Sequence, residues 1–265
     1  MIKRTLKHVW SPQLRNRRDV DVYLPSSYPS GIAYPVVYMK DGQNLSDPST
    51  AFAGTWELDA AIDRLAWRGI EAIYVGVHNS RKRLAEYSPF PDPRHGGGEA
   101  DNYLAFVVDT LKPRIDRMFN TRTDRESTAM LGSSMGGLVS LYAYFRYPSV
   151  FGRAAVMSPS IWFGQGAIVD FIRDARVPRG RVYLDVGTGE GAGTVRDVRR
   201  LGRLLVRKGF RRRRRPPSGG QARILAGERR SSTSSILRYV EDAGARHTEA
   251  AWAWRLQGAL EFLLD

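Results

Sequence analysis

The sequence predicts an α/β fold, in which a mainly parallel, twisted sheet carries helices on both faces and so forms three α/β/α layers. Short β-branched runs with little polar alternation recur along the chain, and such runs are typical of strands covered on both faces. Helical patterns of more than ten residues lie between them, as expected for strand-helix units. Single α/β domains often reach a length of 265 residues, so we expect one domain spanning residues 1–265.

Seven segments have the pattern of a strand. The first alternates in polarity (DVDVYL), and most of the others are short apolar runs bounded by polar or glycine residues. The predicted strands are 19–24, 35–39, 72–77, 128–131, 154–157, 182–186 and 236–241.

Three apolar stripes at helical spacing predict amphipathic helices. Each stripe follows a predicted strand, which supports the alternation of the two element types. The stripes consist of Tyr103, Phe106, Val107, Leu111 and Ile115, then Leu138, Leu141, Tyr142 and Phe145, and finally Trp252, Leu256, Leu260 and Leu263.

The composition limits the classes of protein to which the chain can belong. Hydrophobic residues make up 42% of the chain and aromatic residues 11%, which is enough for a large core. Residues 1–19 are basic and lack the apolar stretch of a signal peptide, and no apolar run reaches the length of a membrane helix, so we expect a cytoplasmic protein with no membrane partner. The absence of cysteine excludes disulfides and thiolate metal sites.

The net charge of +14 is concentrated in one segment. Residues 207–230 hold ten of the 41 Lys and Arg side chains and one acid, so they account for +9 of the total. Residues 211–235 are poor in apolar side chains and rich in Arg, Ser, Gly and Pro, which predicts a flexible excursion from the fold. Because no aromatic residues are interleaved to stack on bases, we expect a solvated loop and no nucleic-acid partner.

The pattern Gly132-Ser133-Ser134-Met135-Gly136 lies between a predicted strand and a predicted helix. It matches G-x-S-x-G, the nucleophile elbow, in which a serine occupies a tight and strained turn between neighbours that must be nearly free of side chains. Centring the pattern on Ser133 would require glycine at Leu131 and Met135. The register therefore predicts Ser134 as the nucleophile.

A serine nucleophile needs a base and an orienting acid, which follow it in the chain order serine, acid, histidine. His247 is the one histidine after Ser134, and it lies between the last predicted strand and the last predicted helix. The segment VYLDVGTGEG offers two acids, Asp185 within the strand and Glu190 in the loop beyond it. We favour Glu190, because a loop side chain can turn toward the imidazole, and Asp242 is a weaker third candidate.

Other residues are candidates for the oxyanion hole and the substrate cleft. The second oxyanion donor normally comes from the loop after an earlier strand, so we predict the backbone N–H groups of Gln43 and Met135 as the pair. His78 and Asn79 end a predicted strand at the same edge as the elbow and could line the cleft. Trp162, followed by Phe163, could form an apolar wall, although a core position is the simpler reading.

Five segments together resemble the putative esterase family of α/β-hydrolases, which is similar to enterochelin esterases, feruloyl esterases and S-formylglutathione hydrolase. They are VVYMKDGQNLSDP (36–48), EYSPF (86–90), LGSSMGGLVSLYAYFRYPSVFG (131–152), YLDVGTGEG (183–191) and GARHTEAAWAWRL (244–256). The resemblance implies an α/β-hydrolase fold, Ser134 as nucleophile, His247 as base, an acid in the loop that holds Glu190, and an oxyanion hole at Gln43 and Met135.

The chain departs from the family pattern in one place. The family usually passes from the helix near position 210 to the strand near position 237 through a short turn. Here residues 211–235 stand between them, so we expect an insertion.

The residues and the resemblance together predict a serine esterase that hydrolyses a small-molecule carboxylic ester through an acyl-serine, without a metal or an organic cofactor. Two alternatives stay open. An alcohol or sugar hydroxyl could accept the acyl group, which would make the protein an acyltransferase. The chain could also be a non-catalytic hydrolase-fold protein that binds a ligand or partner.

Overall fold

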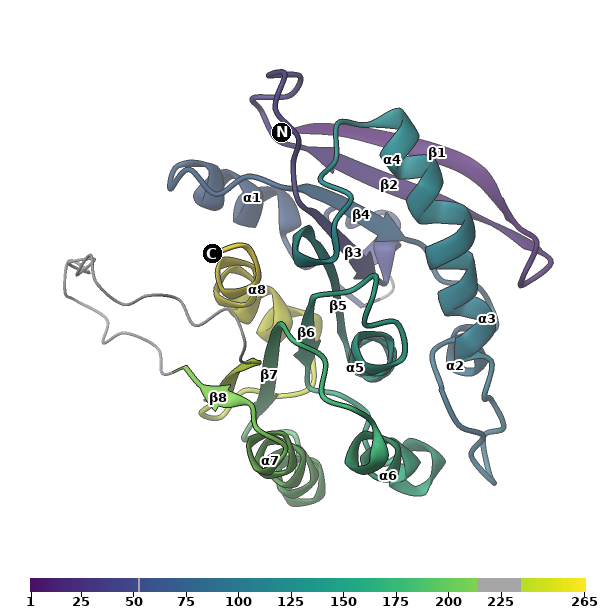
Figure 1. Ribbon diagram of the computed structural model, residues 1–265, viewed down its shortest axis with the longest axis vertical. Helices are drawn as coiled ribbons and strands as arrows, with labels where there is room; N and C mark the ends of the chain where they lie inside the picture. Colours follow the sequence, from purple (N-terminus) through teal and green to yellow (C-terminus); the bar gives the residue numbers. More distant parts are fainter. Residues whose placement is uncertain (52, 214–234) are drawn as a thin grey trace.

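A computed structural model describes residues 1–51, 53–213 and 235–265. Within these ranges the strands form one sheet in the order β1-β2-β4-β3-β5-β6-β7-β9-β8 (Figure 1). The strands are β1 (Ile2–Ser11), β2 (Asn16–Leu24), β3 (Val36–Lys40), β4 (Ile73–Val77), β5 (Thr128–Ser133), β6 (Arg153–Met157), β7 (Arg181–Gly187), β8 (Arg211–Arg212) and β9 (Ile236–Asp242).

All seven predicted strands are present, which confirms the mainly parallel sheet. Every neighbouring pair from β4 to β8 is parallel, whereas β1 and β2 form an antiparallel hairpin that pairs with β4. The strand β1 was not predicted. Most of its side chains on both faces are exposed, so its sequence lacks the alternation or the apolar run that marks a buried strand.

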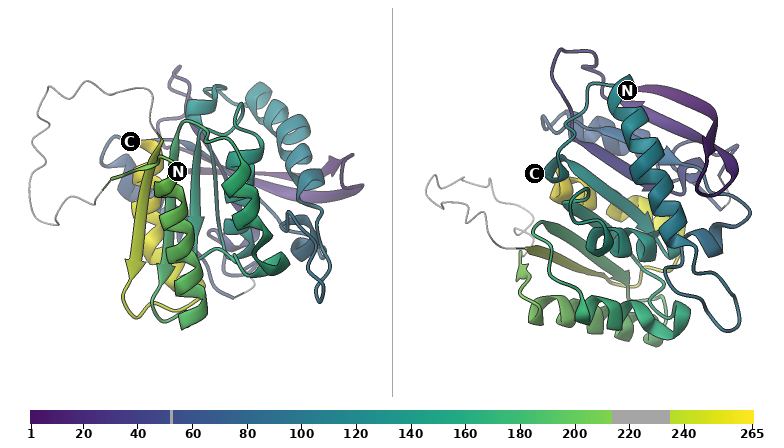
Figure 2. Two further views of the ribbon diagram at one scale, coloured as in Figure 1. Left: turned by 60° about the horizontal axis from the view of Figure 1, so that its bottom comes forward. Right: turned by 45° about the vertical axis from the view of Figure 1, so that its right-hand side comes forward.

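Helices cover both faces of the sheet (Figures 1 and 2). The main helices are α1 (Leu58–Ala66), α2 (Arg83–Glu86), α3 (Ala100–Ala105), α4 (Lys112–Met118), α5 (Met135–Arg146), α6 (Ala167–Asp174), α7 (Ala192–Arg207) and α8 (Glu249–Leu264). Short 3-10 turns form η1 (Gly42–Asn44), η3 (Arg125–Ser127) and η4 (Phe163–Gly166), and a wide helical turn, η2 (Phe106–Leu111), joins α3 to α4.

Two apolar clusters fill the space between the sheet and its helices. The larger cluster packs α3, η2, α4, α5, α6 and α7 on one face, and the smaller one packs α1 and α8 on the other. Every residue of the three predicted helical stripes is buried. These burials confirm the three-layer α/β/α architecture.

The prediction for residues 211–235 needs a correction at its start. Arg211 and Arg212 form β8, and the Arg213 N–H donates to the Leu237 carbonyl over 2.9 Å. This pairing extends the sheet by one short edge strand where a loop was expected. Residues 214–234 lie outside the described residues.

Because the central strands are parallel, the loops that follow them lie together at the carboxyl edge of the sheet. In an open α/β sheet this edge is where ligands bind. The loops that follow β3, β4, β5, β6, β7 and β9 all begin at this edge, and the predicted site residues lie in these loops or in the ends of the strands and helices that they join. In the described part of the chain no helix is both long and apolar enough to cross a bilayer.

Candidate active site

Ser134 lies on the tight turn between β5 and α5. Its backbone has φ 56° and ψ −122°, a conformation that a residue with a side chain rarely adopts. The Ser134 N–H donates to the Met157 carbonyl over 3.0 Å, which ties the turn to the end of the neighbouring strand β6. The sequence pattern therefore folds into the strained turn that it predicts.

The glycines around Ser134 are not equally constrained. A Cβ atom on Gly132 would lie 2.6 Å from the carbonyl carbon of Gly136, which no real side chain tolerates. A Cβ atom on Gly136 would meet the Cβ atom of Lys40 at 3.5 Å, an ordinary contact. The next residue, Gly137, is the tighter one, because its Cβ atom would lie 2.8 Å from the Met157 carbonyl oxygen. The expectation that the pattern glycines stand where there is little room for a side chain is therefore confirmed for Gly132, whereas the position of Gly136 has space for a methyl group.

The structure brings Ser134, His247 and Glu190 together in one line of hydrogen bonds. His247 Nε2 lies 3.0 Å from Ser134 Oγ, and His247 Nδ1 lies 2.8 Å from Glu190 Oε2. The Glu190 side chain is fully buried, whereas that of His247 is 40% exposed. A buried carboxylate thus faces one side of an imidazole whose other side faces the hydroxyl.

Two loops from neighbouring strands hold His247 against Glu190. The strands β7 and β9 are parallel neighbours, so the loops after them leave the same edge. The Thr188 N–H donates to the Asp242 carbonyl over 2.8 Å, and the Gly189 N–H donates to the Ala245 carbonyl over 2.9 Å. The ring of Trp252, on α8, packs edge-on against the imidazole with 4.8 Å between ring centres.

The other oxygen of Glu190 is also fully engaged. Glu190 Oε1 accepts from Ser158 Oγ over 2.6 Å and from the Gly187 N–H over 2.7 Å. Burial alone would raise the pKa of Glu190, but the hydrogen bonds from His247, Ser158 and Gly187 outweigh it and hold the pKa below its usual value. Glu190 is therefore ionised at neutral pH.

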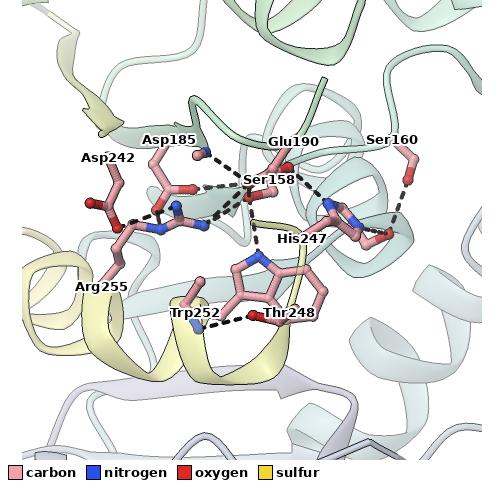
Figure 3. A network of polar contacts seen from close by, with 12 residues as sticks. Ser158, Ser160, Asp185, Glu190, Asp242, His247, Thr248, Trp252 and Arg255 are labelled. Atoms are coloured by element: carbon pink, nitrogen blue, oxygen red, sulfur yellow. Dashed lines mark hydrogen bonds and ion pairs between the residues drawn. The ribbon is translucent and has the colours of Figure 1, made fainter. Parts of the chain in front are cut away.

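Ser158 bridges the Glu190 carboxylate and the Arg255 guanidinium through hydrogen bonds (Figure 3). Its hydroxyl oxygen accepts from Trp252 Nε1 over 3.1 Å and from Arg255 Nη2 over 2.9 Å. With both lone pairs occupied, its one proton is directed to Glu190. Arg255 is 5% exposed and extends from α8 beneath the loop that carries Glu190.

The two alternative acids both face the guanidinium of Arg255 (Figure 3). Asp185 Oδ2 is 3.1 Å from Arg255 Nε, and Asp185 Oδ1 accepts from the Ser158 N–H over 3.0 Å. Burial raises the pKa of Asp185 to about 6, although the Arg255 charge opposes this shift. Asp242 Oδ2 lies 3.6 Å from Arg255 Nη1. Neither carboxylate contacts His247 in the described structure.

The predicted oxyanion donors lie at the ends of adjacent strands. Lys40 on β3 pairs with Gly132 on β5, and Gln43 and Met135 each follow three residues later. Gln43 lies in η1, and Met135 is the first residue of α5. Backbone N–H groups in the first turn of a helix have no acceptor within that helix. Both N–H groups therefore have no acceptor within their own helix, and both residues remain candidates for the oxyanion hole.

The predicted cleft residues differ in their contacts. His78 Nε2 lies 3.0 Å from Asp21 Oδ2, so its ring is engaged by β2. The Asn79 N–H donates to Gln43 Oε1 over 3.1 Å, which places Asn79 beside a predicted oxyanion residue. Trp162 is 52% exposed, in contrast to the core position that was the simpler reading, and its ring packs against His95. Within the described ranges no three His, Asp or Glu side chains are grouped as a metal site requires.

Three residues of the site were not predicted. Ser158 and Ser160 follow β6, and Ser160 Oγ lies 3.1 Å from Ser134 Oγ. Arg255 belongs to the buried side of α8, between Trp252 and Leu256. An arginine within an apolar helical stripe is a signal of a buried ion pair, since arginine is rarely buried without a partner.

Residues 11–263 match the family model described as Putative esterase. The chain belongs to the putative esterase family. Relatives of this chain include named esterases, and the protein is a carboxylic ester hydrolase.

Several relatives and solved structures are similar to this member of the family. The uncharacterized protein YbbA of Bacillus subtilis is 31% identical over 66% of this chain and 70% of its own length. The siderophore enterobactin esterase of Emericella nidulans is 38% identical over 31% of this chain and 26% of its own length. The crystal structure of the BES protein from Bacillus cereus has a TM-score of 0.74 at 20% identity, with 99% of this chain and 95% of that one covered. This likeness confirms the predicted α/β-hydrolase fold.

Proposed function

We propose that this esterase cleaves its substrate through an acyl-serine intermediate, with Ser134 as nucleophile, His247 as general base and acid, and Glu190 as the orienting acid. The observation that carries the proposal is the unbroken line of hydrogen bonds from Ser134 Oγ through the imidazole to the buried Glu190 carboxylate. Its order along the chain, serine then acid then histidine, is that of α/β-hydrolases.

The ionised Glu190 carboxylate can only accept a hydrogen bond, so it places the imidazole proton on Nδ1. Nε2 then carries a lone pair that accepts the Ser134 hydroxyl proton. As Ser134 Oγ attacks the ester carbonyl carbon, this proton moves to Nε2, and the Glu190 charge stabilises the resulting imidazolium. The N–H groups of Gln43 and Met135 receive the negative carbonyl oxygen.

The imidazolium then gives its proton to the departing alcohol oxygen, and an acyl group is left on Ser134. A water molecule repeats the sequence, with His247 Nε2 taking its proton and the carbonyl carbon taking its oxygen. The bond from that carbon to Ser134 Oγ breaks, and Oγ recovers a proton from Nε2. The carboxylic acid leaves, and the enzyme returns to its starting state.

The substrate proposal follows from the relatives and from the cleft. The fungal relative is named a siderophore enterobactin esterase, and the shared segment is 38% identical. The exposed Trp162 ring lies two residues beyond Ser160, which contacts the nucleophile. We therefore place aryl-bearing small-molecule esters, including siderophore-type esters, first in a substrate panel, with p-nitrophenyl acetate as the general probe.

The direct test removes the nucleophile. Ser134→Ala lowers kcat for p-nitrophenyl acetate by a factor on the order of 10⁴ or more, because the acyl-serine cannot form. Ser133→Ala is the matched control, since Ser133 is the preceding residue and is buried but makes no contact with His247 in the described structure. Undiminished hydrolysis by Ser134→Ala would refute the proposal, as would equal losses in both variants.

A further inference from the structure

The hydroxyl of Ser160 contacts the proposed nucleophile and nothing else that is polar in the described structure. Ser160 Oγ lies 3.1 Å from Ser134 Oγ, and its side chain makes no other hydrogen bond within the described ranges. Ser160 is 5% exposed, so its hydroxyl is largely withdrawn from water. A buried hydroxyl normally has a partner, and here the partner is the reacting oxygen itself.

The backbone fixes this contact. The Ser160 N–H donates to the Ser134 carbonyl over 3.1 Å, and the Ser134 N–H donates to the Met157 carbonyl over 3.0 Å. The Phe163 N–H also donates to the Ser160 carbonyl over 3.2 Å. The loop after β6 and the turn after β5 are thus tied in both directions, and the Ser160 hydroxyl stays beside Ser134 Oγ.

The direction of the contact follows from the neighbouring bonds. The Ser134 proton points to His247 Nε2, because the Nδ1 atom of that ring carries the proton shared with Glu190. Ser134 Oγ can therefore only accept from its second partner. Ser160 is therefore the donor, and its O–H points at Ser134 Oγ, the oxygen that gains negative charge during the reaction.

We propose that Ser160 is a further catalytic residue, whose O–H stabilises the charge that collects on Ser134 Oγ when the acyl-serine bond breaks. In that step the bond between the carbonyl carbon and Ser134 Oγ cleaves, and Oγ keeps the electron pair. The proton that Oγ then takes comes from His247 Nε2, and Ser160 keeps its own. The proposal rests on the acyl-serine route.

The effect should be larger in deacylation than in acylation. In acylation of an activated ester, the charge on Ser134 Oγ passes at once to the carbonyl oxygen, and the good leaving group departs. In deacylation, Ser134 Oγ is itself the leaving atom and a poor one, because a serine alkoxide is strongly basic. A second donor to that atom matters most there, since hydrogen bonds to charged groups are the stronger ones.

The test separates the two steps in the Ser160→Ala variant. With p-nitrophenyl acetate, kcat should fall by about 10-fold or more, and an initial burst of p-nitrophenolate should precede the slower steady state. The rate of labelling by a fluorophosphonate, which reports attack by Ser134, should change by less than about threefold. Ser160→Thr keeps the hydroxyl and should restore most of kcat.

The matched control is Ser235→Ala. Ser235 is also 5% exposed, and its hydroxyl donates to the Pro178 carbonyl at the opposite edge of the sheet. This variant should keep both kcat and the labelling rate, and thermal unfolding checks that all three variants are folded. An unchanged kcat in Ser160→Ala overturns the proposal. Equal losses in kcat and labelling also overturn it, as does a folded Ser160→Thr variant that is as slow as Ser160→Ala.

The two proposals fail in different ways. If the fluorophosphonate does not label Ser134 in the unaltered protein, the acyl-serine route itself is wrong. If Ser134 is labelled and Ser160→Ala keeps its deacylation rate, only the role of Ser160 is wrong.

Discussion

Nδ1 of His247 lies 2.8 Å from Oε2 of Glu190, and the nearby Asp185 faces Arg255 instead. We therefore predict that Glu190→Gln lowers kcat by about 10³-fold to 10⁴-fold, because the neutral amide no longer fixes the imidazole tautomer or stabilises the imidazolium. Asp185→Asn should lower kcat by less than about 10-fold. Steady-state hydrolysis of p-nitrophenyl acetate by both folded variants gives the comparison, and a larger loss in Asp185→Asn would reverse the assignment.

Arg255 should contribute to the stability of the fold. Its guanidinium is buried and lies 3.1 Å from Asp185 and 2.9 Å from the Ser158 hydroxyl. We predict that Arg255→Met lowers the free energy of unfolding by about 3 to 5 kcal/mol, because it leaves the buried Asp185 carboxylate without its cation. Urea unfolding measures this loss.

Asp185→Asn in the Arg255→Met background is the control for that cause. The double variant should be more stable than Arg255→Met alone, because the neutral amide needs no counter-charge. If the loss in the double variant instead equals the sum of the losses in the two single variants, the two side chains are not coupled.

Two adjacent glycines of α5 give a steric prediction. Gly137→Ala should lower the free energy of unfolding by about 1 to 3 kcal/mol, because the new methyl group would lie 2.8 Å from the Met157 carbonyl oxygen. Gly136→Ala is the matched control and should leave stability unchanged or raise it, since its methyl group has an ordinary 3.5 Å contact with Lys40 and alanine favours a helix. Chemical unfolding of the two variants tests this, and the reverse order would contradict it.

Lys40 predicts a pH dependence of stability. It is 1% exposed, its Nζ lies 3.0 Å from Ser140 Oγ, and it forms no ion pair within the described ranges. Burial lowers its pKa to about 7, although the charge of Asp41 opposes this shift. Between this value and the ordinary value of 10.5, the unfolded chain binds one more proton than the native one. The contribution of Lys40 to stability therefore rises with pH across that window, and its cost is greatest below pH 7.

Replacement by a neutral side chain removes this cost. Lys40→Met should raise the free energy of unfolding at pH 6 by about 2 to 5 kcal/mol, and this gain should shrink as the pH approaches 10. Comparing the variant with the unaltered protein at each pH cancels the other titrating groups. A gain that does not change with pH would mean that Lys40 titrates normally.

The local pattern of the sequence was sufficient for most of the fold. The seven predicted strands and three helical stripes carry strong signals, because their side chains are buried against one another and their apolar residues recur with a fixed period. The hairpin strand β1 and the two-residue β8 lack that signal, since their side chains are mostly exposed.

The candidate site also has residues that the sequence pattern predicts and residues that it does not. Ser134, Glu190 and His247 could be predicted because the elbow has a sequence pattern and its partners follow in a set order. Ser158 and Ser160 carry no such pattern. Their contacts arise only when β6 lies between β5 and β7, which brings one loop against both the nucleophile and the acid.

The acyl-serine route is tested most directly by trapping the nucleophile. The protein is treated with a fluorophosphonate, digested, and mapped by tandem mass spectrometry, with Ser134→Ala and His247→Ala treated in parallel. We predict a single adduct on Ser134, no adduct in Ser134→Ala, and labelling slowed by a factor on the order of 10³ or more in His247→Ala. An unlabelled protein that still hydrolyses esters, or an adduct on another residue, would contradict the account.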